Sequence, residues 1–86
     1  MSRDSAWFAF DMDDGLQEEA STKRGLLDAI GMRWGTVRED IKIRRYLSGT
    51  YEARFEGDSR TYTLYIVHGR KAAERDGWEF DRETER

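Results

Sequence analysis

Residues 41–67 read IKIRRYLSGTYEARFEGDSRTYTLYIV, and this stretch decides the fold. Apolar and polar side chains alternate along it in three runs, which are separated by Ser48-Gly49 and by Gly57-Asp58-Ser59. A period of two places every second side chain of a strand on the same face of a sheet. Three such runs joined by short turns predict a three-strand antiparallel meander.

The hydrophobic pattern also predicts how the three strands pair. A three-residue loop at residues 48–50 pairs Leu47 with Tyr51 and Ile43 with Phe55. A four-residue loop at residues 57–60 pairs Phe55 with Tyr62, Ala53 with Leu64 and Tyr51 with Ile66. A slip of one residue would move every apolar side chain to the opposite face. We therefore expect one inward face, packed against a helix, made of Tyr51, Phe55, Tyr62, Leu64 and Ile66.

The chain before the meander is expected to form a strand and the main helix. Large side chains suited to a pleated surface predict a strand at Ser5–Met12. Apolar residues recur at near-helical spacing over Leu16–Trp34, which predicts a helix over that range. A shorter helix capped by Ser21 or Thr22 is the open alternative, and Gly35 is expected to end the helix in either case.

After the meander we expect a short helix at Arg70–Asp76 that ends at Gly77, and a last edge strand at Trp78–Phe80. The predicted fold class is therefore α+β. An antiparallel β-sheet, formed by the three-strand meander, the N-terminal strand and the short C-terminal strand, packs against one main α-helix. Residues 1–80 would form this single domain, and residues 81–86 a charged, frayed tail.

Charge is distributed unevenly along the 86 residues, although the net charge is only −3. Residues 1–22 carry a net charge of −5, whereas residues 23–48 carry +4. This pattern predicts separate acidic and basic surfaces, unless folding interleaves them. Three Trp, four Tyr and four Phe supply enough apolar area for a small folded core despite the many charged residues.

Catalytic chemistry finds little support in the sequence. There is no Cys, and His68 is the only histidine, which we expect at a strand end in solvent. The run from Asp11 to Gly15 begins like an EF-hand loop, but Leu16 and Thr22 stand where the loop needs Gly and Glu. We therefore expect a protein that is not an enzyme and has no metal or cofactor. Without a leader-like N-terminus or an apolar span, the expected location is the cytoplasm.

The first binding hypothesis is an acidic docking surface for another protein. Carboxylates gather at the predicted strand end and helix start, namely Asp11, Asp13, Asp14, Glu18 and Glu19. Such a surface complements a basic partner, for example one that uses a basic groove to hold nucleic acid. In size and charge the chain is similar to small phage and mobile-element inhibitors of host defence, anti-CRISPR proteins included. No residue motif supports that similarity.

The second hypothesis is a small domain that binds single-stranded nucleic acid. The non-core face of the meander would display cations and aromatic rings, namely Lys42, Arg44, Tyr46, Arg54 and Tyr65, with Thr63 and Glu52 among them. Mixed bases and aromatic rings on an open sheet hold phosphates and stacked nucleobases. The overall acidity opposes this hypothesis, because nucleic-acid-binding domains usually carry a basic excess. Homodimerisation through an exposed edge strand also stays open.

Overall fold

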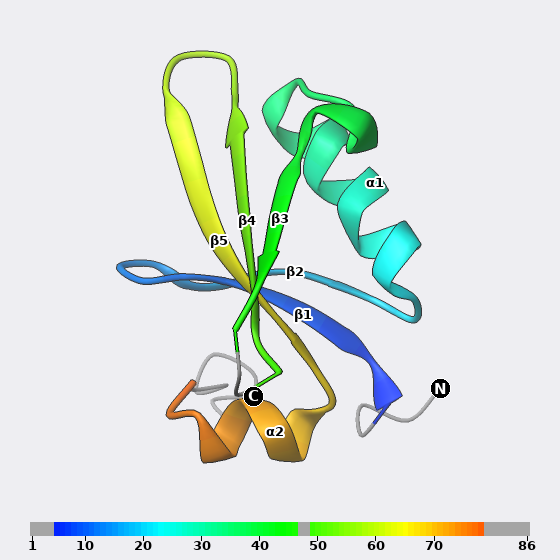
Figure 1. The fold of residues 1–86 in the computed structure, drawn as a ribbon, viewed down its shortest axis with the longest axis vertical. Helices are drawn as coiled ribbons and strands as arrows, with labels where there is room; N and C mark the ends of the chain where they lie inside the picture. The colour runs from blue at the N-terminus through cyan, green and yellow to red at the C-terminus, as the bar shows by residue number, and fades with distance from the viewer. Residues whose placement is uncertain (1–4, 47–48, 79–86) are drawn as a thin grey trace, which may run out of the picture.

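A computed structural model describes residues 5–46 and 49–78 of the chain. Its centre is a five-stranded antiparallel sheet in the order β2-β1-β5-β4-β3 (Figure 1). The strands are β1 (Trp7–Asp11), β2 (Gly15–Ala20), β3 (Lys42–Arg45), β4 (Tyr51–Glu56) and β5 (Thr61–His68). The helices are α1 (Lys23–Trp34), the one-turn 3₁₀ helix η2 (Arg38–Asp40) and α2 (Arg70–Arg75). The predicted α+β class is therefore confirmed.

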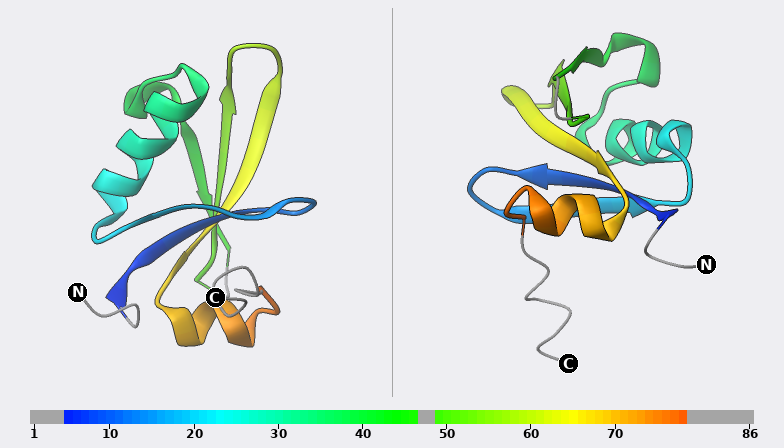
Figure 2. Two further views of the ribbon diagram at one scale, coloured as in Figure 1. Left: turned by 180° about the vertical axis from the view of Figure 1, so that it is seen from behind. Right: turned by 60° about the horizontal axis from the view of Figure 1, so that its bottom comes forward.

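The two longer helices lie on opposite faces of the sheet and bury two separate cores (Figure 2). Side chains alternate between the faces, so Ile66 points toward α1 while its neighbour Val67 points toward α2. The α1 core contains Ala9, Leu26, Leu27, Ile30, Ile41, Ala53, Phe55, Leu64 and Ile66. The α2 core contains Ala6, Phe8, Phe10, Val67 and Ala73. No helix in the described part of the chain is long and apolar enough to cross a membrane.

The predicted meander is present, and its second hairpin has the predicted register. Phe55 pairs with Tyr62, and the two further predicted pairs along β4 and β5 also form. The first hairpin differs by two residues, because Ile43 pairs with Ala53 and not with Phe55. Gly49 has φ 95°, and its N–H donates to the Tyr46 carbonyl. A left-handed glycine is the usual last residue of a three-residue hairpin loop, so the loop closes between Tyr46 and Thr50.

The prediction of a helix starting at Leu16 is wrong, because residues 15–20 form strand β2. An Asp11 carboxylate oxygen accepts hydrogen bonds from the backbone N–H groups of Asp13 (2.8 Å) and Asp14 (3.1 Å). This side-chain turn, followed by Gly15 at φ 80°, reverses the chain and sends it back along β1. The turn geometry thus takes precedence over the helical spacing of the apolar residues in this segment.

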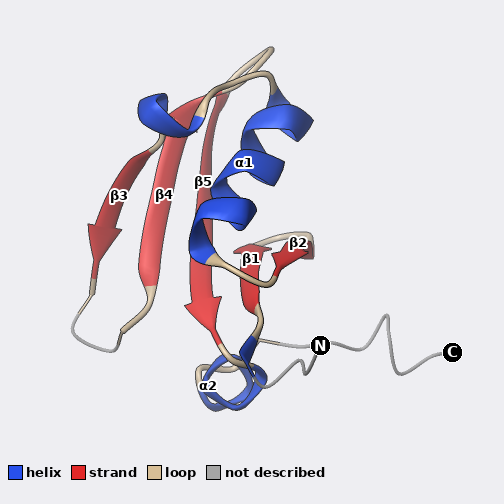
Figure 3. Ribbon diagram, turned by 90° about the vertical axis from the view of Figure 1, so that its right-hand side faces the viewer, coloured by secondary structure: helices blue, strands red, loops and turns tan. Residues whose placement is uncertain are grey.

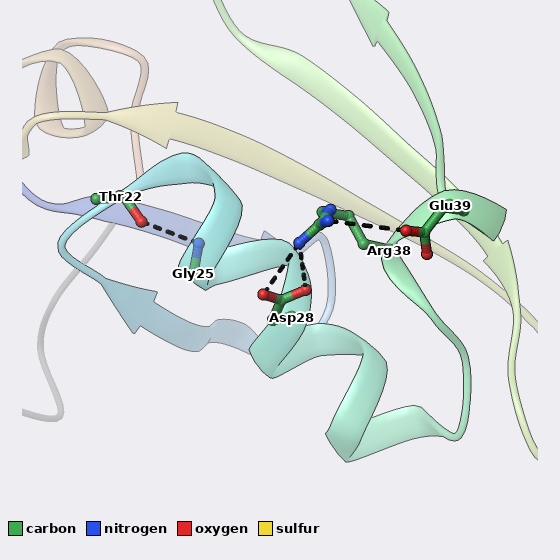
Figure 4. A network of polar contacts seen from close by, with 5 residues as sticks. All are labelled: Thr22, Gly25, Asp28, Arg38 and Glu39. Carbon is green, nitrogen blue, oxygen red and sulfur yellow. Dashed lines mark hydrogen bonds and ion pairs between the residues drawn. The ribbon is translucent and has the colours of Figure 1, made fainter.

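Helix α1 is the shorter helix that the alternative cap predicted. The hydroxyl oxygen of Thr22 accepts a hydrogen bond of 2.9 Å from the N–H of Gly25, which makes Thr22 the N-cap (Figure 4). Gly35 ends the helix at φ 74°, as predicted. Arg38 of η2 donates to both carboxylate oxygens of Asp28, at 2.9 and 3.1 Å, and so ties η2 to α1.

The C-terminal prediction is confirmed up to Gly77. Helix α2 ends at Arg75, and Gly77 has φ 94°. Trp78, expected at the start of an edge strand, instead packs its ring on Phe10 with centroids 4.7 Å apart. The rest of that predicted strand and the tail at residues 81–86 lie outside the described residues.

Candidate functional site

The basic and aromatic residues predicted on the outer side of the meander share one sheet face. We call Lys42, Arg44, Tyr46, Arg54 and Tyr65 the open-face strip. Directly opposite residues of neighbouring strands lie on the same face, and the register places Arg54 opposite Lys42, and Glu52 opposite both Arg44 and Tyr65. Helix α1 lies on the other side of these strands, and α2 packs at one end of the sheet (Figure 3). The three cations and Tyr46 are exposed, whereas Tyr65 is half-buried because its ring stacks on Trp78, with centroids 5.8 Å apart.

Glu52 lies at the centre of the strip and organises its neighbours. The Tyr46 hydroxyl donates to one oxygen of this carboxylate at 2.7 Å, and Arg54 donates to the other at 3.2 Å. These contacts and the charge of Arg54 lower the pKa of Glu52, the Tyr46 hydrogen bond most strongly. The same hydrogen bond raises the pKa of Tyr46. Glu52 was expected only as an opposing charge, yet it holds the Tyr46 ring and the Arg54 guanidinium in position.

Two cations of the strip form no ion pair in the described part of the chain, although Arg44 stands opposite Glu52 and its charge contributes to lowering the pKa of that carboxyl. Among residues 5–46 and 49–78, no carboxylate lies within ion-pair distance of Lys42 or Arg44. Lys42 also stands directly opposite Arg54. Like charges in opposite positions destabilise a sheet, so the folded chain gains no stability from this pairing. A positive surface maintained at such a cost is typical of a site that binds anions.

The acidic docking surface, in contrast, is divided by the fold. Glu18 lies opposite Ala9 on the α1 face, where Arg33 pairs with it at 3.3 Å. Glu19 lies opposite Phe8, on the other face. Asp11 is occupied by the turn that it caps, which leaves Asp13 and Asp14 exposed at the tip of the β1–β2 hairpin. The five predicted carboxylates therefore do not form one continuous patch.

The fold also gathers a group of aromatic rings and cations on the α1 face, near the start of the helix, which the sequence patterns do not reveal. We call Trp7, Lys23, Arg45, Tyr51 and His68 the helix-side cluster. The Trp7 and His68 rings stack with centroids 4.2 Å apart, and the Trp7 and Tyr51 centroids are 6.1 Å apart. The Lys23 ammonium lies 4.1 Å from the centre of the Tyr51 ring, and the Arg45 guanidinium 5.9 Å.

The cluster depends on β1 pairing with β5, which places Trp7 opposite His68. The imidazole Nε2 lies 3.1 Å from the carbonyl oxygen of Ser5, which can only accept, so this nitrogen carries the proton in that contact. His68 is exposed, as predicted, but its ring is held in place by Trp7 and by this hydrogen bond. Pairing the first strand with the last strand of the meander would have revealed the contact from the sequence.

An open groove between α1 and η2 is a third feature of the surface. Its lining consists of Asp28, Gly31, Met32, Thr36, Val37, Arg38 and Glu39. Met32 and Val37 are exposed, whereas Arg38 is engaged by the carboxylates of Asp28 and Glu39 (Figure 4). The groove therefore offers apolar contact area, and its one cation is already neutralised.

The Glu52 network predicts how stability depends on pH. Because folding lowers the pKa of Glu52 from its usual 4.5, its contribution is present above that value and is lost as pH falls through the folded value. In Glu52→Gln the free energy of unfolding should therefore fall less steeply as pH decreases, which urea unfolding between about pH 3 and 6 would measure. Tyr46→Phe removes the main cause of the pKa shift, so in this variant the decrease of the unfolding free energy at low pH should be partly reduced. If the unfolding free energy of the wild-type protein and of both variants depends on pH in the same way, the network does not form in solution.

No protein-family model, curated protein or solved structure matches this chain, so its function is inferred from the geometry of its own residues.

Proposed function

We propose that this domain binds single-stranded nucleic acid on the open-face strip. The observation that carries the proposal is the gathering of three exposed cations and the exposed Tyr46 on one sheet face, where Lys42 and Arg44 form no ion pair with a carboxylate of the described residues. Lys42, Arg44, Tyr46 and Arg54 belong to neither core, whereas the Tyr65 ring stacks on Trp78 at the edge of the α2 core, with centroids 5.8 Å apart. The composition of this exposed part of the strip is therefore free to serve a ligand.

The ligand class follows from the chemistry of these side chains. Lys and Arg pair with phosphates, and exposed tyrosine rings stack with nucleobases in a manner that tolerates any base. Bases are available for stacking only when the strand is unpaired, so a single strand fits this face better than a duplex. Tyr46 is held through its hydroxyl, and its ring remains about one third exposed, at 36%. A ring that is fixed before binding loses little conformational entropy when a base stacks on it.

The net charge of −3 limits the expected affinity but does not oppose the geometry. Within the strip, three cations face one carboxylate, and both oxygens of that carboxylate are engaged by hydrogen bonds. Glu56 lies on the same face two residues beyond Arg54 and accepts a hydrogen bond from the Thr61 hydroxyl, whereas other acids such as Asp13 and Asp14 lie at the hairpin tip. We therefore expect weak, salt-sensitive binding with a Kd of about 1–100 μM.

The test is fluorescence anisotropy with a labelled oligothymidine of about ten nucleotides, titrated at several salt concentrations. Three phosphate contacts predict a slope of log K against log salt of about −2 or steeper. A duplex of the same length should bind more weakly, because its bases are not available to the tyrosines. Absence of oligonucleotide binding at low salt, or a duplex that binds as tightly as the single strand, would overturn the proposal.

A second candidate is a non-enzymatic protein-binding module that uses what remains of the acidic surface. It is favoured by Asp13 and Asp14, which lie exposed on a hairpin that projects from the sheet (Figure 1) and have no basic partner among the described residues. The partner would be basic, and an inhibitory role would follow if its basic surface held nucleic acid. In this case an arginine-rich peptide would bind in place of the oligonucleotide, and Asp13→Lys/Asp14→Lys would abolish that binding.

A further inference from the structure

We infer that the helix-side cluster is a second contact site for the same single strand, which reaches it by passing over the edge of the sheet at β3. The inference rests on the proposed function for the class of ligand. The site itself rests on its own five residues, which lie on the opposite face from the strip. Nucleobases would stack on its aromatic rings, and Lys23 and Arg45 would pair with phosphates.

The aromatic part of the cluster is an ordered platform. The planes of Trp7 and His68 are within 6° of parallel, and His68 is exposed to solvent. One face of the imidazole is covered by Trp7, and its Nε2 contact with the Ser5 carbonyl fixes the rotation of the ring. A nucleobase that stacks on an ordered exposed ring extends an existing stack and orders no further side chain.

The cations of the cluster are arranged around Tyr51, next to that platform. Lys23 and Arg45 both approach the Tyr51 ring, and neither has a carboxylate partner in residues 5–46 or 49–78. Attraction to an aromatic face is weak at exposed sites, about 0.5–1 kcal/mol, and it leaves the positive charge unneutralised. Each cation is therefore positioned by the ring and still available to a phosphate.

Strand β3 connects the two sites. It is an edge of the sheet, and its successive residues Arg44 and Arg45 point to opposite faces. Charges on an edge strand also discourage edge-to-edge aggregation, which by itself would explain these arginines. That explanation does not extend to Lys23 on α1, or to the Trp7–His68 stack on β1 and β5, which lie away from the edge. A strand that crosses β3 would meet cations on both sides of it.

The experiment compares oligothymidines of about four and about twelve nucleotides, of which only the longer can span both faces. The test variant is Lys23→Glu/Arg45→Glu, and Lys23→Gln/Arg45→Gln is the milder form. Acidic residues are favourable in the first turn of a helix, so the change at Lys23 should not disturb α1. One control is Arg60→Glu, which also removes a cation from above a tyrosine on the α1 face, 4.6 Å from the Tyr62 ring and outside the cluster. Because Arg60→Glu changes the net charge by only half as much as the test variant, Lys71→Glu/Arg75→Glu on α2 serves as the charge-matched control.

We expect the test variant to weaken binding of the longer oligonucleotide about tenfold and to reduce the salt slope by roughly 1.4, while Arg60→Glu changes neither. The preference of the wild-type protein for the longer strand should disappear in the test variant. The Trp7 indole N–H signal in ¹H–¹⁵N NMR spectra should shift on binding, which reports directly on the cluster.

The outcomes separate this inference from the proposed function. Binding that is weakened by strip variants but not by the cluster variants, with an unmoved Trp7 signal, would overturn the second site alone. Binding that is weakened only by the cluster variants would support the site and overturn the strip. Thymidine monophosphate that binds the cluster as tightly as the longer strand would overturn the path across β3. If no oligonucleotide binds, both proposals fail.

Discussion

Replacing Phe10 with alanine is expected to lower the free energy of unfolding by about 3–5 kcal/mol, the largest stability effect that we predict for a single substitution. Phe10 has no exposed surface and belongs to the small core on the α2 face. Its ring stacks on Trp78 and lies 6.2 Å from the ring of Phe8, centroid to centroid. Only two of the five buried side chains in this core are large, so removing one leaves a cavity that its small neighbours cannot fill.

Urea or thermal unfolding would measure the change, and Met12→Ala is its matched control. Met12 follows Phe10 by two residues, but 70% of its surface is exposed, so its loss should change stability by less than about 0.5 kcal/mol. Because a domain of this size has a total stability of only about 5–15 kcal/mol, the Phe10 variant should unfold at a clearly lower temperature. A loss of less than about 1 kcal/mol would mean that α2 and Trp78 do not pack on the sheet in solution.

The meander was predictable because two independent signals agreed there. Side chains alternate along β4 and β5, and the glycine-containing loop at residues 57–60 sets the same register as the apolar pattern. In the first hairpin only the alternation of apolar and polar side chains constrains the register. This alternation permits any register shifted by two residues, because such a shift keeps the apolar side chains on the same face. The left-handed conformation of Gly49 decides between these registers, and its position in the loop cannot be derived from alternation.

The N-terminal half shows how local geometry can outweigh periodicity. Leu16 and Ala20 match the helical spacing of the apolar residues that follow them, which favoured one long helix. The Asp11 side chain and Gly15 build a tight turn before that segment, and Thr22 supplies a better helix start after it. Both signals are visible in the sequence, but they outweigh the helical spacing only because β2 can pair with β1.

The two candidate sites also differ in how far the sequence predicts them. The open-face strip lies within the meander, so local alternation was sufficient to bring its residues together. The helix-side cluster joins β1, α1, β3, β4 and β5, and it exists only because β1 inserts between β2 and β5. Sheet order between strands that are distant in sequence is set by the burial of both faces, which no short pattern reveals. The separation of Glu18 from Glu19 has the same origin, since adjacent residues of a strand face opposite sides.

Reversing the two unpaired cations of the strip, in Lys42→Glu/Arg44→Glu, is expected to weaken oligonucleotide binding by about 100-fold. Loss of two charge-assisted contacts of about 1.5 kcal/mol each gives a total of about 3 kcal/mol. Each 1.4 kcal/mol corresponds to about a tenfold change in affinity. The salt slope should fall by roughly 1.4 at the same time. Anisotropy titrations with the ten-nucleotide probe measure both quantities.

The control for this variant is Lys71→Glu/Arg75→Glu on α2, which changes the net charge by the same amount at exposed positions outside the strip. This control distinguishes weakening caused by the position of the charges from weakening caused by the total charge of the protein. The total charge is the main alternative explanation in an acidic domain. Equal weakening by both variants would show that the strip has no special role and that only long-range attraction is measured.

Stability provides the second readout, because the strip variant should lose binding without losing its fold. At position 42 a glutamate would stand opposite Arg54, which replaces a repulsive cross-strand pair with an attractive one, whereas at position 44 a glutamate would stand opposite Glu52, which replaces an attractive pair with a repulsive one. Each exchange contributes about 0.2–1 kcal/mol and the two have opposite signs, so the stability of the variant should stay close to that of the wild-type protein. A side-chain pair whose removal strongly weakens binding while leaving the stability of the fold unchanged is explained by its ligand. A pair whose removal destabilises the protein would instead be structural, and the positive face would lose the physical reason for assigning it a function.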